Sequence, residues 1–183
     1  MIVKKLSLDG ALTVKPEMHE DSRGAFGRIF CQSSLSEHGW HFEVAQVNHS
    51  VNAVAGTVRG LHFQHPPYAE KKMVKCIKGC VYDVIVDLRQ QSPTFLQWEA
   101  VTLSADNRLM IGIPQGFAHG FQVLESGSEL LYFHSDPYVS GSEGAIKYDD
   151  PAIGIEWPSP VSLVSERDQH HSYLPADFKG LVV

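Results

Sequence analysis

The chain has 183 residues, of which 43% are hydrophobic and 20% are charged, and this is the composition of an ordinary globular protein. Its formal net charge of -6 works against nucleic acid or an anionic membrane surface as the main partner. No apolar run approaches membrane-spanning length, and we expect one domain over residues 1–183.

Taken in chain order, the predicted elements are mostly short strands. Before them, a Ser cap and Gly39 predict one or two helical turns over residues 33–38. Strand-like runs with turn residues between them then follow over residues 73–77, 81–88, 98–103, 108–113, 121–124 and 129–134. This spacing predicts an all-β sandwich or barrel. From Pro137 onward the chain is rich in Pro, Gly and Asp, which predicts irregular structure wrapped around the strands.

The cysteines and the first 15 residues of the sequence both indicate where in the cell the protein is expected. Cys31, Cys76 and Cys80 cannot all pair with one another, and the chain has no cysteine-rich framework. Residues 1–15 lack an apolar core ending in small residues, so we expect no signal peptide. A reducing cytoplasm is the simpler location.

Two histidines stand beside glycine and aromatic residues at the edges of apolar runs. His62 lies in Arg59-Gly60-Leu61-His62-Phe63-Gln64, and His119 follows the turn residues Pro114-Gln115-Gly116. An imidazole can take and give a proton near neutral pH, so two of them aimed into one apolar cavity would form an acid–base site. A single histidine on a strand is more often a satisfied core residue, and both interpretations stay open at this point.

Charged residues on the strands add to the acid–base hypothesis. Lys72 shares a strand face with apolar Val74, where a cation is costly unless it meets an anion or a polarised oxygen. Lys75 fits a solvated strand edge instead. Asp83, on the neighbouring strand, would be an inward carboxylate able to orient His119.

Other candidates are less specific. Tyr132 and Tyr138 lie near the end of a strand, where a phenol is usually core or rim but can deliver a proton. Asp168 lies in the irregular tail and, from the sequence alone, is a surface acid. Two histidines on a barrel could ligate iron, zinc or manganese, but Gln64 stands where metal-binding barrels of this type carry their second histidine. We therefore expect no metal.

The motifs occur in order from about Asp21 to Asp168 and together resemble the dTDP-4-dehydrorhamnose 3,5-epimerase family. They read R-G-L-H-F-Q, K-M-V-K-C-I-K-G, V-Y-D-V-I-V-D-L-R, S-P-T-F, L-S-A-D-N, I-P-Q-G-F-A-H-G-F and D-D-P-A-I-G-I-E-W-P. The resemblance implies a cupin-type jelly-roll β-sandwich with short peripheral helices. It also implies a homodimer that uses no metal or other cofactor and takes a nucleotide-diphospho-sugar as its substrate.

Matching positions to the family implies four catalytic roles. His62 matches the base that abstracts a proton, and Asp168 matches the carboxylate that orients it. Lys72 matches the cation over the developing enolate oxygen, and Tyr132 matches the proton donor on the opposite face of the sugar.

Further positions match residues that bind the substrate. Those that match the lining of the pocket are Gln46, Asn48, Arg59, His119, Tyr138 and Glu143. Arg23, in Asp21-Ser22-Arg23-Gly24, matches the residue that meets the diphosphate, in the pocket of the partner subunit. Arg167 stands where the family has a basic ligand-binding residue.

The implied reaction suits these groups. In a 4-keto-6-deoxyhexose the hydrogens on C3 and C5 are both acidified by the C4 carbonyl, so one imidazole can serve both carbons. An ammonium stabilises the charge that then develops on the carbonyl oxygen. The expected activity is inversion at C3 and C5, converting dTDP-4-dehydro-6-deoxy-glucose to dTDP-4-dehydro-rhamnose in deoxysugar or surface-polysaccharide synthesis.

Three departures from the family pattern keep alternatives open. His19 and Arg28 replace a phenylalanine and a glutamate of the thymine pocket, and because an arginine cannot accept a hydrogen bond, a CDP-linked sugar is an alternative substrate. Phe133 replaces a lysine that often follows the donor tyrosine. An epimerase acting at C3 alone, a metal-dependent cupin oxygenase and a non-catalytic sugar-nucleotide binding module are the other interpretations.

Overall fold

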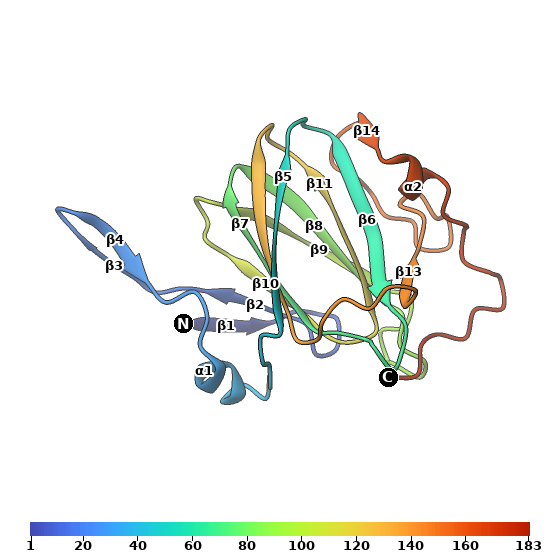
Figure 1. Cartoon of the computed structure of the whole chain (residues 1–183), viewed down its shortest axis with the longest axis horizontal. Helices are drawn as coiled ribbons and strands as arrows, with labels where there is room; N and C mark the ends of the chain where they lie inside the picture. Colours follow the sequence, from blue (N-terminus) through green and yellow to red (C-terminus); the bar gives the residue numbers. More distant parts are fainter.

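Apolar side chains that alternate along the strands allow two sheets to pack face to face, and the computed structural model, which describes residues 1–183, is such a sandwich (Figure 1). One sheet has the strand order β1 (Ile2–Lys5), β2 (Leu12–Lys15), β10 (Met110–Ile113), β7 (Lys72–Lys78), β12 (Ser128–His134) and β5 (Gln46–Asn52). The other has the order β13 (Glu143–Ala145), β6 (Thr57–Gln64), β11 (Phe117–Val123), β8 (Cys80–Asp87) and β9 (Trp98–Ser104). The prediction of an all-β sandwich is confirmed.

The remaining elements are small and peripheral. Strand β14 (Leu163–Val164) pairs in parallel with β6, whereas the other ladders are antiparallel. Helices α1 (Gln32–Ser36) and α2 (Glu166–Gln169) are each about one turn, and no helix of the chain has the length and apolar character needed to cross a membrane. Strands β3 (Met18–Asp21) and β4 (Gly24–Gly27) form a hairpin that projects away from both sheets (Figure 1).

The period-2 pattern of β8 decides how the core is divided. Val81 and Ile85 lie in the main core between the sheets, and Asp83 is buried on the same face. Val84 and Val86 point to the opposite face, where they pack against residues of the irregular C-terminal part. The C-terminal part therefore covers the outer face of the second sheet, as the tail was expected to do.

Two sequence predictions need correction. Strand β11 begins at Phe117 rather than Phe121, so His119 lies inside a strand instead of at its edge. Lys75 is only 8% exposed, because β7 is a central strand flanked by β10 and β12, and its Nζ donates to the carbonyl oxygen of Arg108 at 3.0 Å. Lys75 is therefore a buried, hydrogen-bonded cation and not part of a solvated edge.

The close approach of β6 and β11 sets the position of the two histidines. His62 and His119 are register partners, and the ladder shifts register immediately after His119. A Cβ placed on Gly120 would lie 2.6 Å from the carbonyl oxygen of Arg59 and 2.6 Å from a methyl carbon of Leu61. Only a residue without a side chain allows the two strands to approach this closely.

We expect Gly120→Ala to lower the free energy of unfolding by about 1–3 kcal/mol, because the backbone oxygen it would meet cannot rotate away. Gly127→Ala is a suitable control, since Gly127 has a φ of +78° and a Cβ added there would meet no other part of the chain within 4 Å. It carries a backbone penalty of about 1 kcal/mol without a clash. Urea denaturation measures both variants, and a cost for Gly120→Ala no larger than that for Gly127→Ala would contradict this account.

Candidate active site

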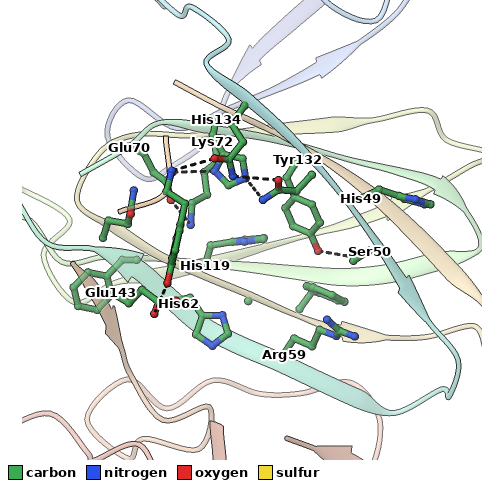
Figure 2. A pocket seen from close by; sticks show the side chains of 17 residues that line it. His49, Ser50, Arg59, His62, Glu70, Lys72, His119, Tyr132, His134 and Glu143 are labelled. Carbon is green, nitrogen blue, oxygen red and sulfur yellow. Dashed lines mark hydrogen bonds and ion pairs between the residues drawn. The ribbon is translucent and has the colours of Figure 1, made fainter. Parts of the chain in front are cut away.

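A cavity of about 330 Å³ opens between the two sheets. Side chains of the second sheet, among them His62 and His119, form one wall, and side chains of the first sheet form the other (Figure 2). Nine of the residues selected from the sequence line it: Gln46, Asn48, Arg59, His62, Lys72, His119, Tyr132, Tyr138 and Glu143. Residues from distant parts of the chain thus meet in one pocket.

His62 is held from behind by Asp168. The Nε2 atom of His62 lies 2.7 Å from Oδ1 of Asp168, and the other carboxylate oxygen accepts the backbone N–H of Gly60 at 3.2 Å. Asp168 is 3% exposed, so the expectation that it is a surface acid was wrong. The side chain of His62 is 40% exposed, which leaves its second ring nitrogen free to reach the cavity.

The ionisation of Asp168 follows from these contacts. Burial acts to raise the pKa of Asp168, but the hydrogen bond and charge of His62 and the N–H of Gly60 outweigh it and lower the pKa to about 2. Asp168 is therefore a carboxylate at neutral pH. It can hold the ring in one orientation and stabilise its protonated form.

The second histidine has its own carboxylate. Nε2 of His119 lies 3.0 and 2.9 Å from the two oxygens of Asp83, and both residues are buried. Burial raises the pKa of Asp83, and the neighbouring His119 offsets part of this rise. The expectation that Asp83 orients His119 agrees with this geometry.

Lys72 is fixed by an anion that the sequence analysis did not select. Its Nζ lies 3.0 Å from Glu70, and Glu70 also binds Nδ1 of His134 at 2.9 Å (Figure 2). Burial acts to raise the pKa of Glu70, but the hydrogen bond from His134 and the charge of Lys72 lower it overall. His134 is two residues from Tyr132 on the same strand face, and that spacing was the signal that could have identified it.

Tyr132 stands on the first sheet, opposite His62. Its hydroxyl lies 3.1 Å from Oγ of Ser50, and its ring meets the ring of His119 edge-on with centroids 6.2 Å apart. Burial raises the pKa of Tyr132 well above that of a free phenol. The hydroxyl therefore stays protonated at neutral pH and is available as a proton donor.

The rim of the cavity is polar. Gln46 and Asn48 are hydrogen-bonded to each other at 3.1 Å on β5. The hydroxyl of Tyr138 donates to Glu143 at 3.2 Å, and Arg167 makes an ion pair with the same carboxylate at 2.9 Å. Arg167, expected as a basic ligand-binding residue, thus lies at the rim next to His62 and Asp168.

Arg23 is the one selected residue far from the cavity. It lies at the tip of the β3–β4 hairpin with its side chain 88% exposed, and its guanidinium binds Asp21 at 2.6 Å. The hairpin projects away from the sheets, so Arg23 cannot serve the pocket of its own chain (Figure 1).

Comparison with known proteins gives a consistent result. A sequence profile of the dTDP-4-dehydrorhamnose 3,5-epimerase family matches residues 5–176. The dTDP-4-dehydrorhamnose 3,5-epimerase of Salmonella typhimurium is 44% identical over 170 residues, which is 92% of each chain.

Solved structures agree. A 3,5-epimerase from Legionella pneumophila in complex with dTDP-4-keto-L-rhamnose has a TM-score of 0.91 and 33% identity, covering 100% of this chain and 98% of that one. A 3'-monoepimerase from Streptomyces bikiniensis in complex with dTDP-quinovose has a TM-score of 0.85 and 34% identity, covering 92% and 85%. These likenesses confirm the predicted cupin-type jelly-roll fold. The chain belongs to the dTDP-4-dehydrorhamnose 3,5-epimerase family of sugar-nucleotide isomerases.

Proposed function

We propose that this protein inverts C3 and C5 of a dTDP-linked 4-keto-6-deoxyhexose, with His62 as the base and Tyr132 as the acid. The observation that carries the proposal is one cavity with an imidazole backed by a buried carboxylate on one wall and a protonated phenol and an ammonium on the other. The family membership and the relatives that act on dTDP-4-keto sugars support the same reaction.

Each step moves one proton. The free ring nitrogen of His62 takes the hydrogen from C3 or C5, and the electron pair of the broken C–H bond moves onto the C4 oxygen as an enolate. Asp168 stabilises the imidazolium that forms, and Lys72 stabilises the oxyanion more than it stabilises the neutral ketone. Tyr132 then returns a proton to the same carbon from the opposite face, which inverts it.

The surrounding residues have supporting roles. The ion pair with Glu70 holds Lys72 in one position, so little reorganisation is needed when negative charge develops nearby. Both oxygens of Asp83 hold the ring of His119, and this ring packs edge-on against the ring of Tyr132. The polar rim residues Gln46, Asn48 and Arg59 offer donors to the sugar and the diphosphate.

Inversion at C3 alone is the second candidate, supported by the likeness to the Streptomyces 3'-monoepimerase. Both activities use the same base. They differ in whether Tyr132 returns a proton to C3 and C5 or to C3 alone. In D₂O the first inverts two carbons and the second inverts one, so the number of deuterium atoms gained per product molecule separates them.

We propose that two copies form a dimer in which Arg23 of each hairpin reaches the diphosphate in the other copy's pocket. The exposure of Arg23 and the projection of the hairpin from the body support this arrangement. A solution mass of one chain, measured by light scattering at micromolar concentration, would contradict it.

The three free cysteines agree with a cytoplasmic location, where thiols stay reduced.

We expect His62→Ala to lower solvent deuterium uptake at C3 and C5 by about a hundredfold or more, because it removes the imidazole that Asp168 supports at the cavity. Asp168→Asn is expected to lower kcat with little change in KM, since it leaves the ring in place but removes the charge that stabilises imidazolium. His65→Ala is the matched control, because His65 is an exposed histidine three residues along the chain that does not line the cavity. If His62→Ala takes up solvent deuterium at the rate of His65→Ala, His62 is excluded as the base.

The phenol of Tyr132 is tested by its pH behaviour. Because burial raises its pKa above 10, we expect no loss of kcat from ionisation of Tyr132 as pH rises to 10. Tyr132→Phe removes the donor, and it should keep proton abstraction, seen as deuterium wash-in to recovered substrate, while it loses inverted product. A Tyr132→Phe variant that makes product at the wild-type rate would assign the acid to another group.

The nucleotide is tested by a thermal-shift screen with dTDP, CDP, UDP and GDP. A ligand that binds only the folded state raises Tm with its affinity, and we expect dTDP to give the largest rise. A larger rise with CDP would instead favour the CDP-linked sugar suggested by His19 and Arg28.

A further inference from the structure

A third side chain converges on the His62–Asp168 pair. His171 follows α2 three residues after Asp168, a spacing that brings both side chains to one side of the turn. Its Nε2 lies 3.4 Å from Oδ1 of Asp168, and the rings of His62 and His171 meet edge-on with centroids 6.0 Å apart. One nitrogen of each histidine and a carboxylate oxygen all lie within 4.8 Å of one another.

The Nε2 atom of His171 has no hydrogen-bond partner although it is buried. Only one other buried side-chain polar atom of the chain, Oδ1 of Asn52, shares this condition. A buried polar atom left unpaired has lost its hydrogen bonds to water and gained none in return, so each one calls for an explanation. Here the unpaired nitrogen lies beside a carboxylate and a second imidazole.

Two imidazoles and one carboxylate are a ligand set for borderline transition metals such as Zn²⁺, Ni²⁺ and Co²⁺, and a poor one for Mg²⁺ or Ca²⁺. Zinc bonds of about 2.0–2.1 Å at a tetrahedral centre separate neighbouring ligand atoms by about 3.3 Å. The separations from Oδ1 of Asp168 are 2.7 Å to His62 and 3.4 Å to His171. Small side-chain shifts would therefore place all three atoms around one ion.

We propose that His62, Asp168 and His171 form a binding site for a divalent transition-metal ion, and that an ion bound there inhibits the enzyme. The metal would bind Nε2 of His62 and Oδ1 of Asp168, and the one proton of the neutral imidazole would then lie on the ring nitrogen that faces the cavity. With that nitrogen already protonated, a metal-bound His62 has no free lone pair to take a proton from carbon. The inhibition rests on the proposed function, whereas the binding does not.

The binding arm uses the full chain without a histidine tag, freed of metal by chelation. We expect isothermal titration with ZnCl₂ to show one ion per chain, and CoCl₂ to give the visible absorption of bound Co²⁺. His171→Asn should weaken Zn²⁺ binding by more than about a hundredfold, since even loss of an outer partner of a metal site costs 10–100-fold. The control is His170→Asn, which changes the adjacent exposed histidine.

The activity arm measures deuterium uptake with added Zn²⁺, each variant relative to its own metal-free rate. Zn²⁺ should inhibit deuterium uptake by wild type and by His170→Asn, and EDTA should restore both rates. The rate of His171→Asn should change little on addition of Zn²⁺. Equal Zn²⁺ affinity in His171→Asn and wild type would overturn the site, as would binding without inhibition of an active enzyme. If His171→Asn does not fold, judged by its circular dichroism, His171→Gln makes the same test. Tight binding by a chain with no epimerase activity would support the site and reject the proposed function instead.

Discussion

The contact between Asp168 and His62 joins two parts of the chain that are 106 residues apart. His62 belongs to β6 in the second sheet, and Asp168 belongs to α2 in the C-terminal part that follows the last strand. The Oγ of Ser165 caps α2 by accepting the N–H of Asp168, and Gly60 of β6 donates its N–H to the Asp168 carboxylate, so Asp168 is held both within α2 and against β6. A carboxylate kept charged behind one imidazole is the constraint on which the proposed chemistry depends.

The sandwich divides the chemistry between its sheets. Base and supporting carboxylate lie on the β6 side, and the ammonium and the phenol come from β7 and β12 on the facing sheet. A six-membered ring held between the walls would then have its base and its acid on opposite faces, which inversion requires. The close packing of β6 against β11 at Gly120 fixes one wall, and the cross-strand pairing of Lys72 with His134 fixes the other.

Much of this arrangement was predictable from the sequence, and the reasons differ between residues. The alternation in β8 predicted the inward direction of Asp83, because strand faces follow a period of two. The roles expected of Tyr132 and Asp168 came from the family motifs, since each residue alone indicates only a rim phenol or a surface acid. Glu70 and His171 were missed because no sequence motif marks them. Glu70 is identified by its contacts with Lys72 and His134, and His171 by its approach to Asp168, and both are visible only in the fold. Lys75 was misjudged because a local pattern does not reveal whether a strand is central or at an edge.

A crystal structure with a dTDP-linked 4-keto sugar or its product bound in the cavity tests the central claim most directly. The account predicts that the free ring nitrogen of His62 faces C3 and C5 on one side of the sugar, with the hydroxyl of Tyr132 on the other side and Nζ of Lys72 at the C4 oxygen. A sugar with His62 and Tyr132 on the same face, or bound away from His62, would contradict it.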